Sequence, residues 1–151
     1  MQIQWIVRKF EELTPLEVYR ILQLRNEVFV VEQNCVFQDA DDKDQPSFHL
    51  MAMKGDRLVA YTRLVPPGIA YEEPSIGRVV TSPSVRGTGI GKELMLRSIK
   101  TTEELFGLLP IKIGAQLYLN KFYSSLGFQQ CSEVYLEDGI EHIYMIRKSD
   151  S

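Results

Sequence analysis

The feature that most constrains the fold is a strand, a glycine-rich turn, a helix and a second strand in immediate succession. Residues 75–80 (SIGRVV) are expected to form a strand, and residues 86–91 (RGTGIG) form the turn. The following KELMLRSIKTTEEL has the propensity and spacing of a helix. Residues 111–115 (IKIGA) are short and apolar, like a buried parallel strand. Such a crossover is right-handed, so its helix lies on one face of a sheet.

Antiparallel strands are expected on both sides of this crossover. A tight Gly55-Asp56 turn predicts a β-hairpin before it, and the turn at 137–139 predicts another after it. The expected strands are residues 2–9, 49–54, 57–65, 129–136 and 140–147.

Two further helices are expected from local signals. Thr14 and Glu17 have the spacing of a capping box, and the helix that follows should run to about Phe29. Residues 117–126 are expected to form a short helix. The element order is therefore β-α-β-β-β-α-β-α-β-β. It predicts an α/β (α+β) fold with a mixed central sheet, in a single domain over residues 1–151.

The composition narrows the class of protein. Hydrophobic residues make up 44% and charged residues 25%, as in an ordinary soluble globular protein. The net charge of −3 lacks the basic excess that nucleic-acid binders use against phosphates, but it is compatible with a cationic substrate. Residues 1–15 lack the pattern of a signal peptide, and no stretch approaches about 20 apolar residues, so we expect a cytoplasmic protein without a membrane partner. Cys35 and Cys131 stand alone, without ligands at metal spacing, so we expect no metal site.

The glycine-rich turn has the chemistry of a phosphate cradle. Gly87, Gly89 and Gly91 allow a sharp turn and a close approach of the backbone to a ligand. The free N–H groups and the dipole of the following helix favour an anion, and Arg86 and Lys92 add positive charge. The spacing is neither the GxxxxGK[ST] of a nucleotide P-loop nor the GxGxxG of a dinucleotide fold. A purely structural tight turn remains the alternative.

Two motifs together resemble those of the GNAT acyltransferases. The pattern RxxGxG, after the strand IGRVVTSP and before an amphipathic helix, is similar to that family's coenzyme A signature. The downstream NKFYSSLGF resembles the second motif of the family, in which a short helix carries an Asn and a Tyr and ends in Gly-Phe. The strings LRNEVFVVEQNC, IGRVV, GAQ and EDGIEHI extend the resemblance to the ElaA-type branch and over nearly the whole chain.

The resemblance implies a binding site for acetyl-CoA as co-substrate. Residues 87–91 would hold the pyrophosphate, and the strand at 79–81 would pair through its backbone with the pantetheine arm. For this, the strands at 75–81 and 111–115 must splay apart, so that a backbone N–H near residue 79 or 80 faces the thioester oxygen. Asn120 would contact coenzyme A or would be a polar surface residue. The expected cofactor-binding residues are Val79, Val80, Thr81, Arg86, Gly87, Thr88, Gly89, Ile90, Gly91, Lys92 and Asn120.

The candidate catalytic residue is Tyr123, which matches the tyrosine of the second motif. A phenol with an ordinary pKa of ~10 stays protonated at neutral pH and can give its proton to a departing thiolate. The alternative is that Tyr123 only packs its helix against the sheet.

The general base is left open by the sequence. Glu32 and His142 are the candidate acceptor-side residues, because both lie in strings that resemble the ElaA-type branch. A structural role is the alternative for His142, as it is for His49. The four aspartates within residues 39–44 would bind a cationic acceptor or form a solvated loop, which is the usual state of a short charge run.

The resemblance to the GNAT family, together with these residues, implies an N-acetyltransferase that moves an acetyl group from acetyl-CoA to a primary amine by direct attack. The acceptor is expected to be a small-molecule or protein amine, and a homodimer is left open. Two other classes of protein are weighed against this. A non-catalytic coenzyme A-binding protein would keep the glycine turn but need not keep Tyr123, and a protein-interaction module would have no use for the turn.

Overall fold

The computed structural model describes residues 2–149. Its strands form two four-stranded sheets. The first sheet has the order β1-β2-β3-β4, and the second is built around β8, which pairs with β5, β6 and β7. The strands are β1 (Gln4–Lys9), β2 (Phe48–Lys54), β3 (Arg57–Val65), β4 (Ser75–Thr81), β5 (Ile111–Gln116), β6 (Gln129–Gln130), β7 (Tyr135–Glu137) and β8 (Ile140–Arg147). The predicted mixed α/β fold is confirmed, with the strands in the predicted order.

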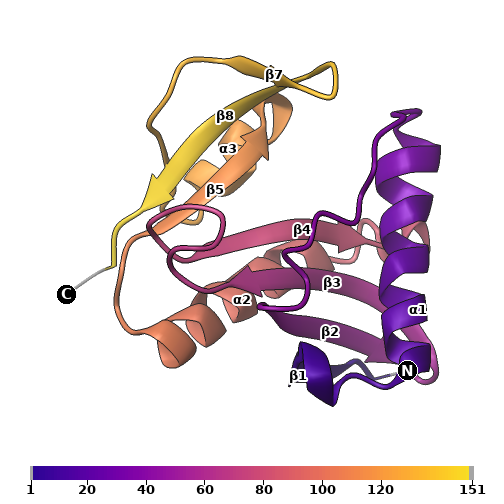
Figure 1. Ribbon diagram of the computed structural model, residues 1–151. Helices are drawn as coiled ribbons and strands as arrows, with labels where there is room; N and C mark the ends of the chain where they lie inside the picture. Colours follow the sequence, from indigo (N-terminus) through magenta and orange to yellow (C-terminus); the bar gives the residue numbers. More distant parts are fainter. Residues whose placement is uncertain (1, 150–151) are drawn as a thin grey trace.

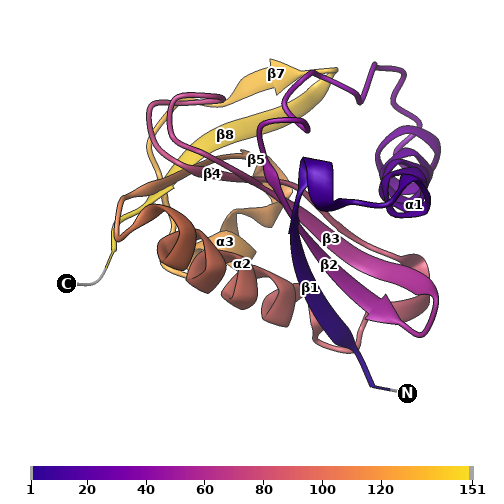
Figure 2. The ribbon, with the colours of Figure 1, turned by 60° about the horizontal axis from the view of Figure 1, so that its bottom comes forward.

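Helices cover both faces of the first sheet (Figures 1 and 2). On one face, α1 (Pro15–Arg25) packs Ile21 against Met51 of β2 and Tyr61 of β3. On the other face, α2 (Ile90–Phe106) buries an apolar stripe that includes Leu94, and the short α3 (Asn120–Ser124) adds to the same core. Alternate residues of the strands enter these two cores because successive side chains point to opposite faces of a sheet.

The first helix begins as predicted but continues beyond Phe29. Thr14 Oγ1 accepts a hydrogen bond from Glu17 N at 3.1 Å, and Glu17 Oε1 accepts one from Thr14 N at 2.8 Å. After α1 the chain widens into a π-helix over Asn26–Glu32. A pattern built on 3.6 residues per turn does not register this change, because π-helical bonds join residues five apart. The extension carries Glu32 to the edge of the cavity described below.

Strands β4 and β5 begin together and then separate. Lys112 N donates to Pro74 O at 3.0 Å where the two strands start, and within residues 2–149 no further pairing joins them. The ladder partner of β5 is β8, which runs antiparallel to it. The predicted splay is therefore present.

The expected strand at residues 129–136 is interrupted. It is divided into β6 and β7, and both pair with β8. Between them, the Ser132 hydroxyl accepts a hydrogen bond from Tyr144 N at 2.8 Å, so a side chain replaces a backbone partner at this point. The apolar and polar alternation of the segment does not show such a break.

The acidic segment 39–44 is not a solvated loop, so that expectation was wrong. Three of its carboxylates form a buried ion cluster with arginines of α1, β3 and β4. The Arg25 side chain is fully buried, and its Nε lies 2.7 Å from Asp39 Oδ2. A short charge run is usually solvated, and the sequence alone does not pair these aspartates with arginines that are distant along the chain. The ion cluster consists of Arg25, Asp39, Asp41, Asp44, Arg63 and Arg78.

Asp44 links two arginines of this ion cluster. Its Oδ1 lies 2.7 Å from Arg25 Nη1 and 3.0 Å from Arg63 Nη1. Burial would raise the pKa of the Asp44 carboxyl, but the hydrogen bonds and charges of the two arginines lower it below its usual value. The stabilising contribution of Asp44 is therefore complete above the unfolded-state pKa of about 3.9 and is lost as the pH falls through the lower folded-state pKa.

We expect Asp44→Asn to lower the free energy of unfolding by about 3 kcal/mol, since it leaves two buried arginines short of a counter-charge. Glu93→Gln is the matched control, because Glu93 pairs with Arg97 on the surface of α2 with side chains about half exposed. It should change the stability by less than about 0.5 kcal/mol. Urea denaturation measures both. Below about pH 4 the stability of the parent protein should fall more steeply than that of Asp44→Asn; equal slopes would contradict the role given to Asp44.

Candidate active site

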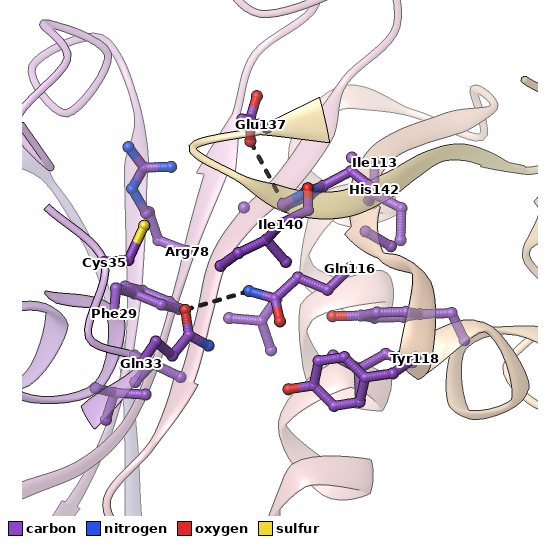
Figure 3. A pocket seen from close by; sticks show the side chains of 18 of the residues that line it. Phe29, Gln33, Cys35, Arg78, Ile113, Gln116, Tyr118, Glu137, Ile140 and His142 are labelled. Carbon is purple, nitrogen blue, oxygen red and sulfur yellow. Dashed lines mark hydrogen bonds and ion pairs between the residues drawn. The ribbon is translucent and has the colours of Figure 1, made fainter. Parts of the chain in front are cut away.

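A cavity of about 630 Å³ lies between the splayed strands β4 and β5 (Figure 3). Its wall also includes the π-helix, the loop that follows it, the segment at 118–123 and the β7–β8 hairpin. We call the part lined by Thr81, Arg86 and Gly91 the turn end, and the part lined by Glu137 and His142 the hairpin end. Most of the residues that the sequence singled out lie on this one surface.

The glycine turn shapes the turn end of the cavity. Gly87 and Gly89 have φ angles of +81° and +83°, in the left-handed region that favours glycine. Gly89 is the N-cap of α2, so the first backbone N–H groups of that helix have no acceptor within the helix. A Cβ atom built on Gly87, Gly89 or Gly91 would meet no atom within 4 Å. The backbone is therefore open to a ligand on this side, as the phosphate-cradle hypothesis requires.

The other residues of the turn have different surroundings. The Thr88 hydroxyl donates to Val85 O, which holds the turn together. Ile90 is buried in the core beneath α2, and Lys92 is exposed on the first turn of that helix. Only the backbone of Ile90 can therefore serve a ligand, whereas Lys92 has a side chain free to reach one.

Arg86 and Glu32 are brought together although they are 54 residues apart in the sequence. Arg86 Nη1 and Nη2 each donate to one oxygen of the Glu32 carboxylate at 2.6 Å. Both side chains are 42% exposed, so the pair lies at the mouth of the cavity. The hydrogen bond from Arg86 lowers the pKa of the Glu32 carboxyl. Glu32 is thereby a weaker proton acceptor than an unpaired carboxylate.

Strand β4 contains a β-bulge at the middle of the cavity wall. Tyr61 of β3 pairs with Val80 and Arg63 pairs with Gly77, so two residues of β4 oppose one residue of β3. Arg78 lies at this bulge with a φ angle of +49°, which is uncommon for a residue with a Cβ atom. Its Nε lies 2.9 Å from Asp39 Oδ1, so the ion cluster holds the bulged residue. A bulge bends its strand, which accounts for the divergence of β4 from β5.

Tyr123 lies on α3, lines the cavity and is almost completely buried. Its ring packs edge-on against Phe122 and Phe128, with ring centroids 5.2 Å and 6.0 Å away. Burial raises the pKa of the Tyr123 phenol to about 12, so it stays protonated well above neutral pH. Asn120 lies one turn earlier, where its Oδ1 accepts a hydrogen bond from the Ser124 hydroxyl at 2.9 Å, and it is not among the cavity-lining residues. Of the two residues from the second motif, Tyr123 therefore lines the cavity and Asn120 does not.

His142 lies near the start of β8 at the hairpin end of the cavity (Figure 3). Its Nδ1 donates to Ile140 O at 2.8 Å, so in the neutral ring Nε2 carries the lone pair. Glu137 of β7 places Oε2 3.6 Å from this Nε2. Glu137 was not among the predicted site residues, although it is the first residue of the string EDGIEHI. A carboxylate beside an imidazole lone pair can bind an ammonium group and accept a proton from it.

Two contacts cross the cavity and join the first helical region to the second sheet. Gln116 Nε2 donates to Gln33 Oε1 at 3.4 Å, and Cys35 Sγ donates to Asp138 O at 3.3 Å. Gln33 and Gln116 were not among the predicted site residues, and no local signal in the sequence pairs them. Both contacts narrow the access to the hairpin end.

His49 has a structural role. Its ring is buried, with Nδ1 2.6 Å from the Tyr61 hydroxyl and Nε2 2.9 Å from Asp44 O. Burial lowers the pKa of the His49 imidazole, which favours the neutral ring. The structural alternative is thus confirmed for His49, whereas His142 lines the cavity.

No metal-binding cluster and no membrane-spanning helix are found in the part of the chain that the structure describes. Within residues 2–149, no group of three or more His, Cys, Asp or Glu side chains is placed to hold a metal ion. In the same range, no helix has the length and apolar character needed to cross a membrane.

Comparisons with known proteins agree with this geometry. A family model described as an acetyltransferase (GNAT) domain matches residues 14–149. The protein ElaA of Escherichia coli is 42% identical over 148 residues, which cover 97% of each chain. The crystal structure of an acyl-CoA N-acyltransferase from Pseudomonas aeruginosa has a TM-score of 0.93 at 42% identity, over 97% of this chain and 99% of the other. The crystal structure of Escherichia coli ElaA has a TM-score of 0.91 at 41% identity, over 97% of this chain and all of the other.

Proposed function

Since the chain belongs to the GNAT acetyltransferase family, we propose that it is an acetyl-CoA-dependent N-acetyltransferase acting on a primary amine. The observation that carries the proposal is one cavity that runs from an open glycine turn, between two splayed strands, to an imidazole and a carboxylate. The similar Pseudomonas aeruginosa protein is named an acyl-CoA N-acyltransferase, which supports an acyl-CoA as the donor. A cytoplasmic location stays a prediction from the sequence.

The donor would lie along the free edge of β4. The backbone N–H groups at the start of α2, which Gly89 and Gly91 leave accessible, would bind the pyrophosphate, with Arg86 and Lys92 supplying positive charge. The unpaired backbone of residues 79–81 would hydrogen-bond the pantetheine arm in the manner of an added strand. A backbone N–H of that edge would donate to the thioester oxygen and stabilise its negative charge as the bond forms.

His142 is the better candidate for the general base. Its Nε2 carries a lone pair at the cavity wall, whereas the carboxylate of Glu32 accepts both N–H groups of Arg86. His142 would take one proton from the ammonium group and leave a neutral amine, which is the nucleophile. Glu32 would then hold Arg86 in place rather than transfer a proton.

Tyr123 would act on the leaving group. The amine nitrogen forms a bond to the carbonyl carbon while the bond from that carbon to sulfur breaks, and the departing thiolate takes the phenolic proton of Tyr123. The second proton of the nitrogen restores the phenol. The net products are an N-acetylated amine, coenzyme A with a free thiol, and the proton held by His142. A buried phenol whose pKa is raised to about 12 remains a proton donor throughout the physiological range.

We expect Arg86→Ala to weaken acetyl-CoA binding by about 1–3 kcal/mol, toward the lower value because the side chain is 42% exposed. Calorimetric titration measures this change. Arg57→Ala is a control, because Arg57 is an exposed residue at the start of β3 and does not line the cavity. Binding of pantetheine, which lacks the phosphates, should be unaffected by Arg86→Ala. An equal loss for pantetheine would show that Arg86 acts on the fold through Glu32 instead.

A further inference from the structure

We propose that the acceptor is a small primary amine whose single ammonium group is attached to an apolar body about the size of an aromatic ring. The proposal rests on the transferase function proposed above and concerns the hairpin end of the same cavity. It names Glu137 as the residue that recognises the ammonium group.

The charges of the cavity wall are mostly paired already. Arg86 is bound to Glu32, and Arg78 belongs to the buried ion cluster. Among the described lining residues, the carboxylates without an Arg or Lys partner are those of Glu137 and Asp138. These two residues are neighbours at the β7–β8 turn, so the unpaired negative charge is concentrated at one end of the cavity. That arrangement suits one cationic centre rather than several spaced along a chain.

The hairpin end has the spacing of an ammonium site. Glu137 Oε2 and His142 Nε2 are 3.6 Å apart, which is too far for a good hydrogen bond between them. An ammonium nitrogen beside the two atoms, about 2.8 Å from each, can donate one N–H to the carboxylate and one to the ring lone pair. The same position gives His142 the proton that the amine must lose before it attacks. Recognition and activation of the amine thus occur at one point.

The wall opposite this hairpin carries aromatic rings beside the polar side chains of Gln33 and Arg78. Figure 3 shows Phe29 and Cys35 across the cavity from His142, and Phe37 also lines it. The guanidinium of Arg78 next to the Phe37 ring, 6.0 Å from its centroid, is already paired with Asp39 and Asp41. This wall therefore offers no free carboxylate to a second ammonium group, whereas an apolar group would gain contact with two rings.

The contacts across the cavity favour a small molecule over the side chain of a folded protein. The Gln33–Gln116 hydrogen bond and the contact of Cys35 Sγ with Asp138 O join opposite walls near the hairpin end. The His142 side chain is 10% exposed, so an amine carried on a protein surface would have to enter the cavity beside these contacts to reach its Nε2. A free amine of modest size can enter the cavity without a protein attached to it.

The test measures thiol release from acetyl-CoA with phenethylamine, spermidine and a lysine-containing peptide as acceptors. We expect kcat/KM to be at least tenfold higher for phenethylamine than for the other two. In Glu137→Gln, which keeps the shape of the side chain, the KM for phenethylamine should rise about tenfold because the charged partner is lost. The KM for acetyl-CoA should stay unchanged. Glu141→Gln is the matched control, an exposed glutamate on the neighbouring strand β8 that does not line the cavity.

The Phe37→Ala variant tests the same proposal in a second way. It should lower kcat/KM for phenethylamine more than for methylamine, which has no apolar body to contact the ring. A higher kcat/KM for spermidine or the peptide, or an unchanged KM for phenethylamine in Glu137→Gln, would overturn the proposed acceptor class while the transferase function stood. Absence of thiol release with every amine would contradict both proposals.

Discussion

Turnover of the Tyr123→Phe variant should fall about 10²-fold, the lower range for loss of a general acid. The substitution removes only the phenolic hydroxyl, so the ring keeps its edge-on contacts with Phe122 and Phe128. Affinity for acetyl-CoA should stay near the parent value, because the proton is needed only when the thiolate leaves. Steady-state kinetics with a saturating amine measure the turnover, and calorimetric titration measures the affinity for acetyl-CoA.

The alternative role for Tyr123, packing α3 against the sheet, predicts the reverse pattern. Activity would then be nearly intact and only the stability would change slightly. Parent-level turnover in Tyr123→Phe would mean that another group or a water molecule protonates the thiolate. The raised pKa of Tyr123, about 12, adds a check with a definite sign. Because burial raises it, the phenol should not cause a loss of activity near pH 10, where an exposed tyrosine would titrate.

The Gly91→Val variant should lose measurable stabilisation by acetyl-CoA while it remains folded. A Cβ atom on Gly91 meets no protein atom within 4 Å, so the added methyl groups occupy only the space in which a pyrophosphate must approach the backbone. Gly91 lies in the first turn of α2, where replacing glycine costs the helix nothing. Thermal unfolding with and without acetyl-CoA shows both effects in one experiment.

Gly91 is a cleaner test position than Gly89. The φ angle of +83° at Gly89 would strain any side chain there, so a loss of binding at Gly89 could come from the backbone. Gly91→Ala completes the series. It should raise the stability of the unliganded protein by up to about 1 kcal/mol and still weaken acetyl-CoA binding. Unchanged affinity in Gly91→Val would show that the ligand does not approach this turn.

The sequence predicted those parts of the fold that depend on local signals. The capping box of Thr14 and Glu17 fixed the start of α1, and the glycine turn fixed the start of α2 to within two residues. The order of elements in the crossover was also predicted from local patterns, whereas the splay of its two strands was expected only from the resemblance to the GNAT family. Each of the locally predicted features depends on residues close together in the sequence, so a single chain is enough to show them.

The parts that could not be predicted depend on contacts between distant segments. Arg86 and Glu32 were each selected, but their pairing across 54 residues was not, and this pairing is the reason why we propose His142 rather than Glu32 as the base. The aspartates of residues 39–44 were expected to lie in a solvated loop, but Asp39 and Asp44 are paired with the buried Arg25 in the ion cluster. Glu137 escaped notice because a glutamate in a hairpin turn is ordinary until its distance from His142 is known.

The most direct test of the proposed function is an assay in which the purified protein, acetyl-CoA and a mixed set of primary amines are incubated together. Thiol release is followed while mass spectrometry identifies the acetylated amine. The predicted result is thiol release that depends on both protein and amine, with one acetylated amine formed for each thiol and none formed by Tyr123→Phe above about a hundredth of the parent rate. Thiol release without an acetylated amine, or no release from a protein that acetyl-CoA stabilises, would contradict the transferase and leave a coenzyme A-binding protein.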